Sequence, residues 1–138
     1  MQTEALGAKL ARSLRPGDVV VVEGELGVGK TTLVRGACRE LGVSGIVTSP
    51  TFTIGQRYPA PTPVSHLDLF RISSLDKEDP ELLADYVGPE AISFIELPPQ
   101  QQSGRDEISA AISALGTIAA RVMLAHAGGD RRLVQVES

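Results

Sequence analysis

Residues 24–31 contain the pattern whose chemistry is clearest. They read Gly-Glu-Leu-Gly-Val-Gly-Lys-Thr and fit the phosphate-binding loop pattern G-x-x-x-x-G-K-[ST]. The glycines let backbone N–H groups turn around an anion, and a following helix adds N–H groups and a partial positive charge. Lys30 can reach the β- and γ-phosphates, and the Thr31 hydroxyl can ligate Mg²⁺. The loop therefore predicts binding of a magnesium-bound nucleoside triphosphate.

The segments on both sides of this loop have the patterns that such a loop needs. Strand 18–22 contains a run of four valines, which is typical of a strand buried on both faces of a parallel sheet. In the expected helix 30–41, apolar residues recur at helical spacing and leave a polar side for solvent. Cys38, the one cysteine, lies on the apolar side, so we expect it to pack in the core rather than react. Strand, loop and helix together predict a phosphate cradle.

Two polar residues further along the chain are candidates for the catalytic machinery. Thr51 lies in Ser49-Pro50-Thr51-Phe52, where proteins with this loop commonly sense the γ-phosphate, although local backbone hydrogen bonding explains a lone hydroxyl equally well. Asp68 lies near the carboxyl end of the expected strand 64–71, where open α/β sheets bind ligands. It could orient the attacking water or hold a water on Mg²⁺. The alternative is a structural salt bridge with Arg71.

Glu96 ends the apolar strand 91–96 and is the leading candidate for a metal-site carboxylate. In nucleotide hydrolases with this loop, a second strand delivers such an acid to the Mg²⁺ shell or to the attacking water. His66 shares a strand face with Asp68, because side chains alternate along a strand. Alone, His66 is expected to be a hydrogen-bonded packing residue and not a catalyst.

The other segments predict an α/β fold of the P-loop NTPase type. It would be a three-layer sandwich with a mixed sheet and antiparallel C-terminal strands. Residues 108–115 fit a helix and a strand equally well. Residues 117–126 and 131–136 flank a Gly-Gly-Asp sequence and favour a β-hairpin. The remaining expected elements are an amphipathic helix 3–14, a short strand 53–58, an extended connector 59–63 and an acidic helical insertion 73–90.

Composition predicts a soluble, cytoplasmic protein with one domain over residues 1–138. The chain is 42% hydrophobic and has a net charge of −4, which argues against a broad nucleic-acid-binding face. A local basic patch at Arg131-Arg132 is the one candidate for such contacts. A single cysteine excludes an internal disulfide, and no apolar run is long enough to span a membrane.

Together these motifs resemble the TsaE family, formerly called YjeE, of small bacterial P-loop ATPases. Residues 24–31 have the form G-E-x-G-x-G-K-T, and residues 66–71 have the form H-x-D-x-[YF]-R. The other two matches are Ser49–Phe52 and Ile95-Glu96. The chain departs from the family at two positions, with Leu97 where a tryptophan is usual and Phe70 where a tyrosine is usual.

The resemblance implies a function and a set of site residues. Family members hydrolyse ATP while bound to the TsaB–TsaD heterodimer, in the pathway that makes threonylcarbamoyladenosine next to the tRNA anticodon. Contact with tRNA would be indirect, through that complex. By matching motifs, Thr31 and Glu96 would hold Mg²⁺, Thr51 would belong to a switch segment, and Asp68 would support hydrolysis. The residues implied to bind the nucleotide are Gly24, Gly27, Val28, Gly29, Lys30, Thr31 and Thr32.

Three alternatives remain open from the sequence. A small-molecule kinase is the first, since many carry the same loop, but little chain beyond residues 73–90 is left for a substrate-binding lid. A signalling GTPase would need a base-reading N-K-x-D motif, which the chain lacks. The third is a nucleotide-gated docking module in which hydrolysis is incidental. We predict a partner-dependent ATPase, since no obvious internal arginine finger is present.

Overall fold

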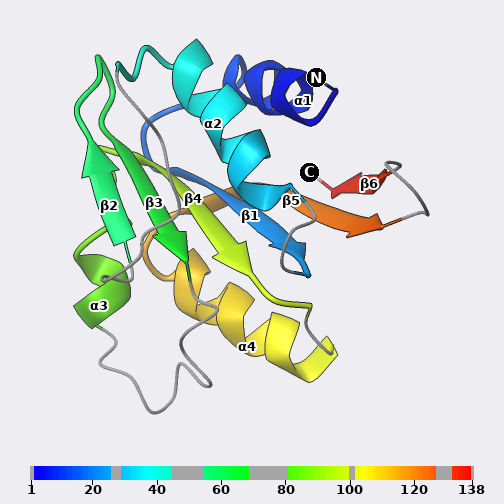
Figure 1. The fold of residues 1–138 in the computed structure, drawn as a ribbon. Coiled ribbons are helices and arrows are strands. Elements are labelled where there is room, and N and C mark those ends of the chain that lie inside the picture. The colour runs from blue at the N-terminus through cyan, green and yellow to red at the C-terminus, as the bar shows by residue number, and fades with distance from the viewer. Residues whose placement is uncertain are drawn as a thin grey trace.

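The computed structural model describes residues 2–25, 29–44, 55–68, 81–99, 102–126 and 132–137, which form a mixed sheet with helices on both faces (Figure 1). The helices are α1 (Gln2–Ala11), α2 (Lys30–Glu40), α3 (Glu81–Ala84) and α4 (Gln102–Ser113). The strands are β1 (Asp18–Gly24), β2 (Gly55–Tyr58), β3 (Val64–Asp68), β4 (Ile92–Leu97), β5 (Thr117–His126) and β6 (Arg132–Glu137).

The sheet has six strands in the order β2-β3-β4-β1-β5-β6, so the strand before the loop lies inside it. Strand β1 pairs in parallel with β4 and β5, and β3 pairs in parallel with β4. The outer strands β2 and β6 are antiparallel to their neighbours β3 and β5. The predicted mixed sheet with an antiparallel C-terminal hairpin is therefore confirmed.

Both faces of β1 are buried, which explains its four consecutive valines. Val20 and Val22 point into a core beneath α1 and α2, and Val19 and Val21 point into a second core beneath α4. A strand that packs helices on both faces requires apolar residues at every position. The three-layer α/β sandwich expected from the sequence is the observed architecture (Figure 1).

The structure decides the assignment of residues 108–115, which the sequence left open between helix and strand. Helix α4 covers 102–113, and Ile112 is fully buried against the second core. Ile108, Ala111 and Leu115 pack beside it, as helical spacing requires. The face of β1 and β4 turned away from α2 needs a cover, and an additional strand in the sheet would not provide one.

Several boundaries differ from those expected. Helix α1 ends at Ala11 and not at residue 14, because the backbone N–H groups of Ser13 and Leu14 bond to carbonyls three residues back and form turns. Of the acidic insertion 73–90, the described part contains the four-residue α3 followed by a turn, and residues 73–80 lie outside the described residues. Within the described residues, every helix is too short or too polar to cross a membrane.

Helices α1 and α2 cross with their backbones almost in contact. A Cβ added to Gly36 of α2 would lie 2.0 Å from the Glu4 carbonyl oxygen, and one added to Gly7 of α1 would lie 2.0 Å from the Leu33 carbonyl oxygen. Both neighbours are backbone atoms, which cannot rotate away as a side chain can. The two glycines therefore fix the distance between α1 and the helix that begins at Lys30.

A Gly36→Ala variant tests this close crossing. In an exposed helix the change stabilises by up to about 1 kcal/mol, because alanine is the better helix former. Here we expect a loss of about 1–3 kcal/mol or more in the free energy of unfolding, because α1 has to move away. Urea unfolding measures the change. Gly88→Ala is the control, since a Cβ there meets nothing within 4 Å. Equal effects of the two substitutions would contradict the proposed contact.

Candidate functional site

The described ends of the glycine-rich loop join β1 to α2. Gly24 is the last residue of β1, and Lys30 is the first residue of α2. Between them, Gly29 has a φ of 104°, a left-handed conformation that glycine adopts without strain. Because glycine has no side chain, it makes no side-chain capping bond to α2, and a helix N-terminus of this kind suits an anion. Gly27 and Val28 lie outside the described residues.

Strand register brings the two predicted carboxylates to the same edge of the sheet. Glu96 of β4 pairs with Asp68 of β3 on one side and with Val22 of β1 on the other. All three strands are parallel, so their carboxyl ends meet where β1 runs into the loop. Glu96 is 3% exposed, whereas Asp68 is half-buried and reaches water.

The Thr31 side chain contacts Glu96 directly. Its hydroxyl lies 3.2 Å from Oε1 and 3.1 Å from Oε2 of the carboxylate, so the first turn of α2 is tied to the end of β4. These two residues were the predicted metal ligands, and they are 65 positions apart in the chain. The structure brings their oxygens together.

Lys30 is folded back onto the loop that precedes it. Its Nζ donates hydrogen bonds to the carbonyl oxygen of Gly24 and, at 3.0 Å, to that of Glu25. Lys30 is 4% exposed, and this burial lowers its pKa to about 8. The negative charges of Glu96, Asp68 and Glu25 oppose this shift in pKa. The ammonium group and both predicted carboxylates therefore share one site.

His66 belongs to the same site, in a way that its sequence position did not reveal. Its Nε2 contacts Oε2 of Glu96, and the imidazole is fully buried. One signal was present in the sequence, because alternation along the strand put His66 on the same face as Asp68. The expectation of a hydrogen-bonded packing residue describes its burial but not its partner, which is the predicted metal ligand.

The residues present fit Mg²⁺. A threonine hydroxyl and a carboxylate are hard oxygen donors, the type that this ion prefers. Among the described residues, no group of three or more His, Cys, Asp or Glu side chains forms a complete protein cage for a metal. Mg²⁺ in nucleotide sites uses one or two protein oxygens and takes its other ligands from phosphate and water. The Thr31–Glu96 pair matches that pattern.

The remaining predicted residues have varied positions. Thr32 lies half-buried in the first turn of α2. Leu97, where the family usually has tryptophan, is 2% exposed and packs in the second core, so it cannot stack on a ligand in this arrangement. Thr51, Phe70 and Arg71 lie outside the described residues, as does Arg131. Cys38 is buried, and burial raises the pKa of its thiol to about 12, in agreement with a packing role.

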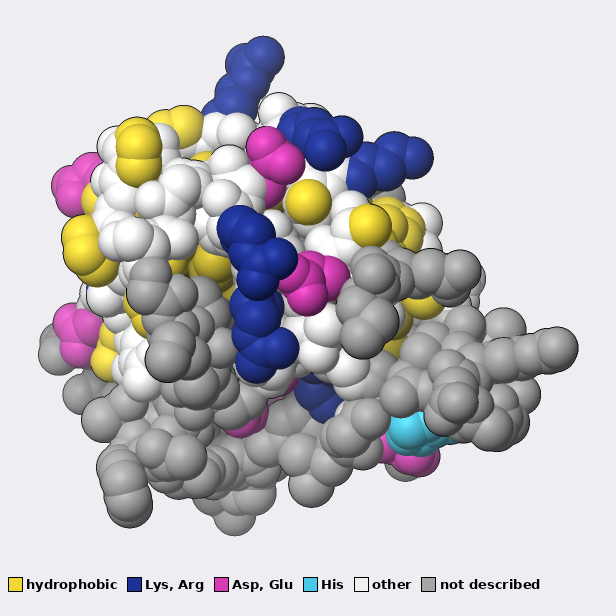
Figure 2. Space-filling model, turned by 45° about the horizontal axis from the view of Figure 1, so that its top comes forward, with side chains coloured by type: hydrophobic (Ala, Val, Ile, Leu, Met, Phe, Trp, Pro, Cys, Tyr) yellow, Lys and Arg dark blue, Asp and Glu magenta, His cyan; other side chains and the backbone are white. Residues whose placement is uncertain are grey.

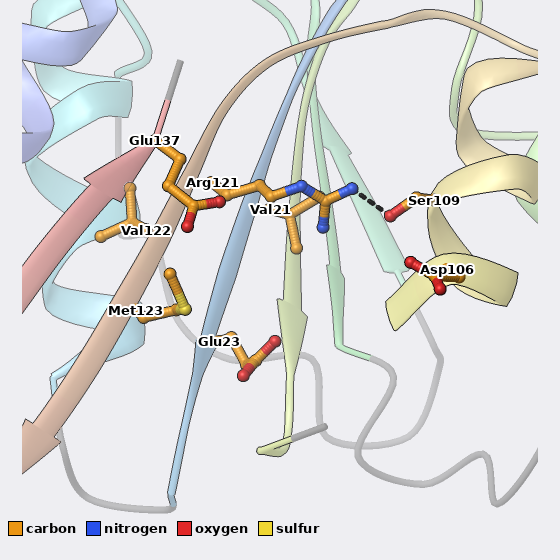
Figure 3. Close-up of a pocket in the computed structure, with 8 residues that line it drawn as sticks. All are labelled: Val21, Glu23, Asp106, Ser109, Arg121, Val122, Met123 and Glu137. Atoms are coloured by element: carbon orange, nitrogen blue, oxygen red, sulfur yellow. Dashed lines mark hydrogen bonds between the residues drawn. The ribbon is translucent and has the colours of Figure 1, made fainter. Parts of the chain in front are cut away.

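Two hollows of the described structure lie away from this site. One, of about 180 Å³, lies between β1, β5, β6 and α4, where Glu23 and Asp106 face the Arg121 side chain (Figure 3). The other lies along α1 and α2, where Lys and Arg side chains stand beside Asp and Glu side chains (Figure 2). There Arg39 pairs with Glu4. None of the predicted nucleotide or metal residues lines either hollow.

Comparison with known proteins identifies the family. The model of the family described as threonylcarbamoyl adenosine biosynthesis protein TsaE matches residues 1–122. The chain belongs to the TsaE family. The match includes Lys30, Thr31, Asp68 and Glu96, and it ends within β5.

Individual TsaE proteins agree with this assignment. A Streptomyces coelicolor protein described as tRNA threonylcarbamoyladenosine biosynthesis protein TsaE is 52% identical over 71 residues, covering 49% of this chain and 48% of its own length. A Bacillus subtilis protein of the same description is 36% identical over 96 residues, covering 69% of this chain and 60% of its own. The chain thus spans about half to three-fifths of these curated relatives. The crystal structure of Bacillus subtilis YdiB is similar with a TM-score of 0.68 and 28% identity, over 98% of this chain and 76% of that one.

Because Lys30 is buried while it is charged, we expect it to lower the free energy of unfolding. The pKa of Lys30 is about 8 in the native protein and 10.5 when unperturbed, so the native state holds the proton less tightly. Below pH 8 the lysine is charged in both states and the full cost is present. Between pH 8 and 10.5 the native lysine releases its proton and the cost disappears.

A Lys30→Met variant should therefore be more stable than the wild type in the absence of nucleotide. The gain should reach up to about 3 kcal/mol at neutral pH, because methionine keeps the apolar stem without the charge. The gain should shrink as the pH rises from 8 to 10.5. Urea unfolding of both proteins across this range measures it, with Lys9→Met as an exposed control. A gain that does not change with pH would be inconsistent with a buried charge.

Proposed function

We propose that this TsaE-family protein is a P-loop ATPase that supports the synthesis of threonylcarbamoyladenosine on tRNA. One observation carries the proposal: Lys30, Thr31, Glu96 and Asp68 converge where the carboxyl ends of β1, β3 and β4 meet the N-terminus of α2. A cation, a helix N-terminus and two carboxylates at one edge of a parallel sheet are the parts needed to bind and hydrolyse ATP with Mg²⁺.

Each residue has a role in binding the triphosphate. The loop from Gly24 to Gly29 and the first N–H groups of α2, at Lys30, Thr31 and Thr32, surround the phosphates. Lys30 exchanges its two carbonyl partners for phosphate oxygens, which restores a counter-charge to a buried ammonium. Thr31 and Glu96 hold Mg²⁺, which when bound neutralises charge on the phosphates.

The charges present explain why the nucleotide would need the metal. Glu96, Asp68 and Glu25 all lie close enough to affect the pKa of Lys30, so three carboxylates surround one ammonium among the described side chains. A triphosphate added to this arrangement would be repelled by these acids. We therefore expect ATP to bind tightly only together with Mg²⁺.

The geometry favours different roles for Glu96 and Asp68. Glu96 is buried and already contacts Thr31 and His66, so it suits a fixed metal ligand. Asp68 lies in the same row of the sheet but reaches water, so it suits the residue that accepts a hydrogen bond from the attacking water and orients it. In the proposal Thr51 belongs to the segment that responds to the γ-phosphate.

Three arginines of the described residues have partners away from the site. Arg12 pairs with Glu40 at 3.5 Å, Arg39 pairs with Glu4, and Arg57 donates to the Tyr86 carbonyl oxygen at 2.9 Å. Hydrolysis of ATP gains strongly from an additional positive charge at the γ-phosphate. The proposal therefore includes activation by a partner, the TsaB–TsaD heterodimer, with tRNA contacted through that complex in the cytoplasm.

Substitutions at the site should separate binding from hydrolysis. Lys30→Ala should abolish ATP–Mg²⁺ binding in calorimetry, because it removes the ammonium group that contacts the described start of the loop. Asp68→Ala should retain binding and lower the hydrolysis rate by roughly 100-fold or more, because the water is no longer oriented. Asp106→Ala, on an exposed carboxylate of α4, is the control. Normal ATP binding by Lys30→Ala would contradict the proposed site.

Mixing with the partners should raise the ATPase rate. We expect slow turnover by the isolated protein and a rise of at least about 10³-fold with TsaB–TsaD if they supply a missing cation. Phosphate release measures both rates, with Lys30→Ala as the inactive control. Equal rates with and without the partners would reject partner activation, and transfer of phosphate to an added hydroxyl compound would favour a small-molecule kinase instead.

A further inference from the structure

We propose that His66 is a positioning residue for Glu96: it donates a hydrogen bond from Nε2 to Oε2 and so orients the carboxylate that holds Mg²⁺. This inference rests on the proposed function, since it assigns a role in the same site. It concerns a residue that the sequence alone presented as a packing histidine.

The fold places His66 where it can act on Glu96 and on little else. His66 pairs in register with Phe94 on β4, and Glu96 lies two residues beyond Phe94 on the same strand. His66 is 0% exposed and Glu96 is 3% exposed, so water does not compete for their contact. The Tyr58 ring packs beside the imidazole, with the ring centroids 6.5 Å apart. The histidine side chain is thus held between packed neighbours and its polar partner, Glu96.

The hydrogen-bonding state of the ring follows from its partner. A carboxylate accepts hydrogen bonds, so Nε2 is the nitrogen that carries the proton toward Glu96. Among the described residues, the buried Nδ1 has no hydrogen-bond partner. A buried polar atom without a partner costs stability, and an apolar side chain of similar size would avoid that cost. A histidine here is therefore better explained by the bond that it gives to Glu96 than by packing.

The two oxygens of Glu96 are used differently. Oε2 contacts both His66 and the Thr31 hydroxyl, whereas Oε1 contacts the Thr31 hydroxyl at 3.2 Å. If the Thr31 hydroxyl turned to a bound Mg²⁺, the carboxylate would lose part of its restraint. The bond from His66 would still hold Glu96 in the orientation that suits a metal ligand. Partners of metal-binding carboxylates commonly tune metal affinity in this way.

Two substitutions of His66 distinguish this role from packing. His66→Gln can place an amide nitrogen near the position of Nε2 and donate the same bond, whereas His66→Leu fills the space with no donor. Ser65→Ala is the matched control: Ser65 is the neighbouring residue of β3, is 0% exposed, and bonds to the Tyr86 carbonyl oxygen at 2.7 Å. Thermal unfolding of each variant establishes that it is folded.

The first measurement is the Mg²⁺ dependence of nucleotide binding, titrated with a non-hydrolysable ATP analogue. His66→Leu should weaken the apparent Mg²⁺ affinity by about 10- to 100-fold. His66→Gln should recover most of that loss, and Ser65→Ala should leave the affinity unchanged. Binding of the analogue with the metal chelated should be the same in all four proteins. Unchanged Mg²⁺ affinity in His66→Leu, or equal losses in His66→Gln and His66→Leu, would overturn the proposal.

The second measurement needs no nucleotide. The chain has two histidines, so ¹⁵N-edited spectra contain one buried ring and that of the exposed His126. We expect a slowly exchanging Nε2–H signal from His66 that is lost in Glu96→Ala. Absence of that signal in the wild type would overturn the inference. If the signal is present but the wild type does not bind ATP–Mg²⁺, the contact stands and the proposed function, with the role assigned here, is what fails.

Discussion

The contact between the first turn of α2 and the end of β4 is the interaction on which the rest of this structure depends. Thr31 and Glu96 close it with the hydroxyl of a half-buried residue and a buried carboxylate. Burying a carboxylate is costly unless its oxygens are hydrogen-bonded. Lys30, one residue before Thr31, adds a buried cation beside it. The first turn of α2 therefore carries both the bond and the charge that make a buried acid tolerable.

The sheet and the helix pair supply the precision that this contact requires. Strand β4 lies between β1 and β3, so the position of Glu96 is fixed by two parallel ladders and cannot shift without breaking both. On the helix side, Gly36 and Gly7 bring α2 against α1 at backbone distance. A helix held this closely along its length cannot move its first turn independently. The position of Thr31 thus depends on helix packing that lies away from the loop.

Local patterns in the sequence predicted the parts of the site that are built from consecutive residues. The valine run and the following amphipathic helix specify β1 and α2 on either side of the glycine-rich segment, and the structure confirms both elements. Glu96 was predicted because an acid ending an apolar strand is informative once a phosphate loop is present. The placement of Asp68 beside it depends on two strands being neighbours, and the observed register provides that.

Pairs that depend on register or on a second layer were not accessible from the sequence. His66 and Glu96 are 30 residues apart, and only the parallel alignment of β3 with β4 makes them partners. Residues 108–115 fit two periods because alanine and isoleucine alternate there, and the choice of a helix came from the uncovered face of the sheet. Local propensity predicted neither the His66–Glu96 contact nor the helix, so tertiary packing decided both.

Two side chains of the site are buried in a way that lowers the stability of the fold. Lys30 is buried with a pKa near 8, and His66 is buried with one ring nitrogen that has no partner among the described residues. A buried charge and a buried ring nitrogen without a partner are each unfavourable in a core. Lys30 converges on the loop and His66 on Glu96. Under the proposed function, the triphosphate and its metal supply the interactions that folding leaves incomplete, so their binding should stabilise the folded protein.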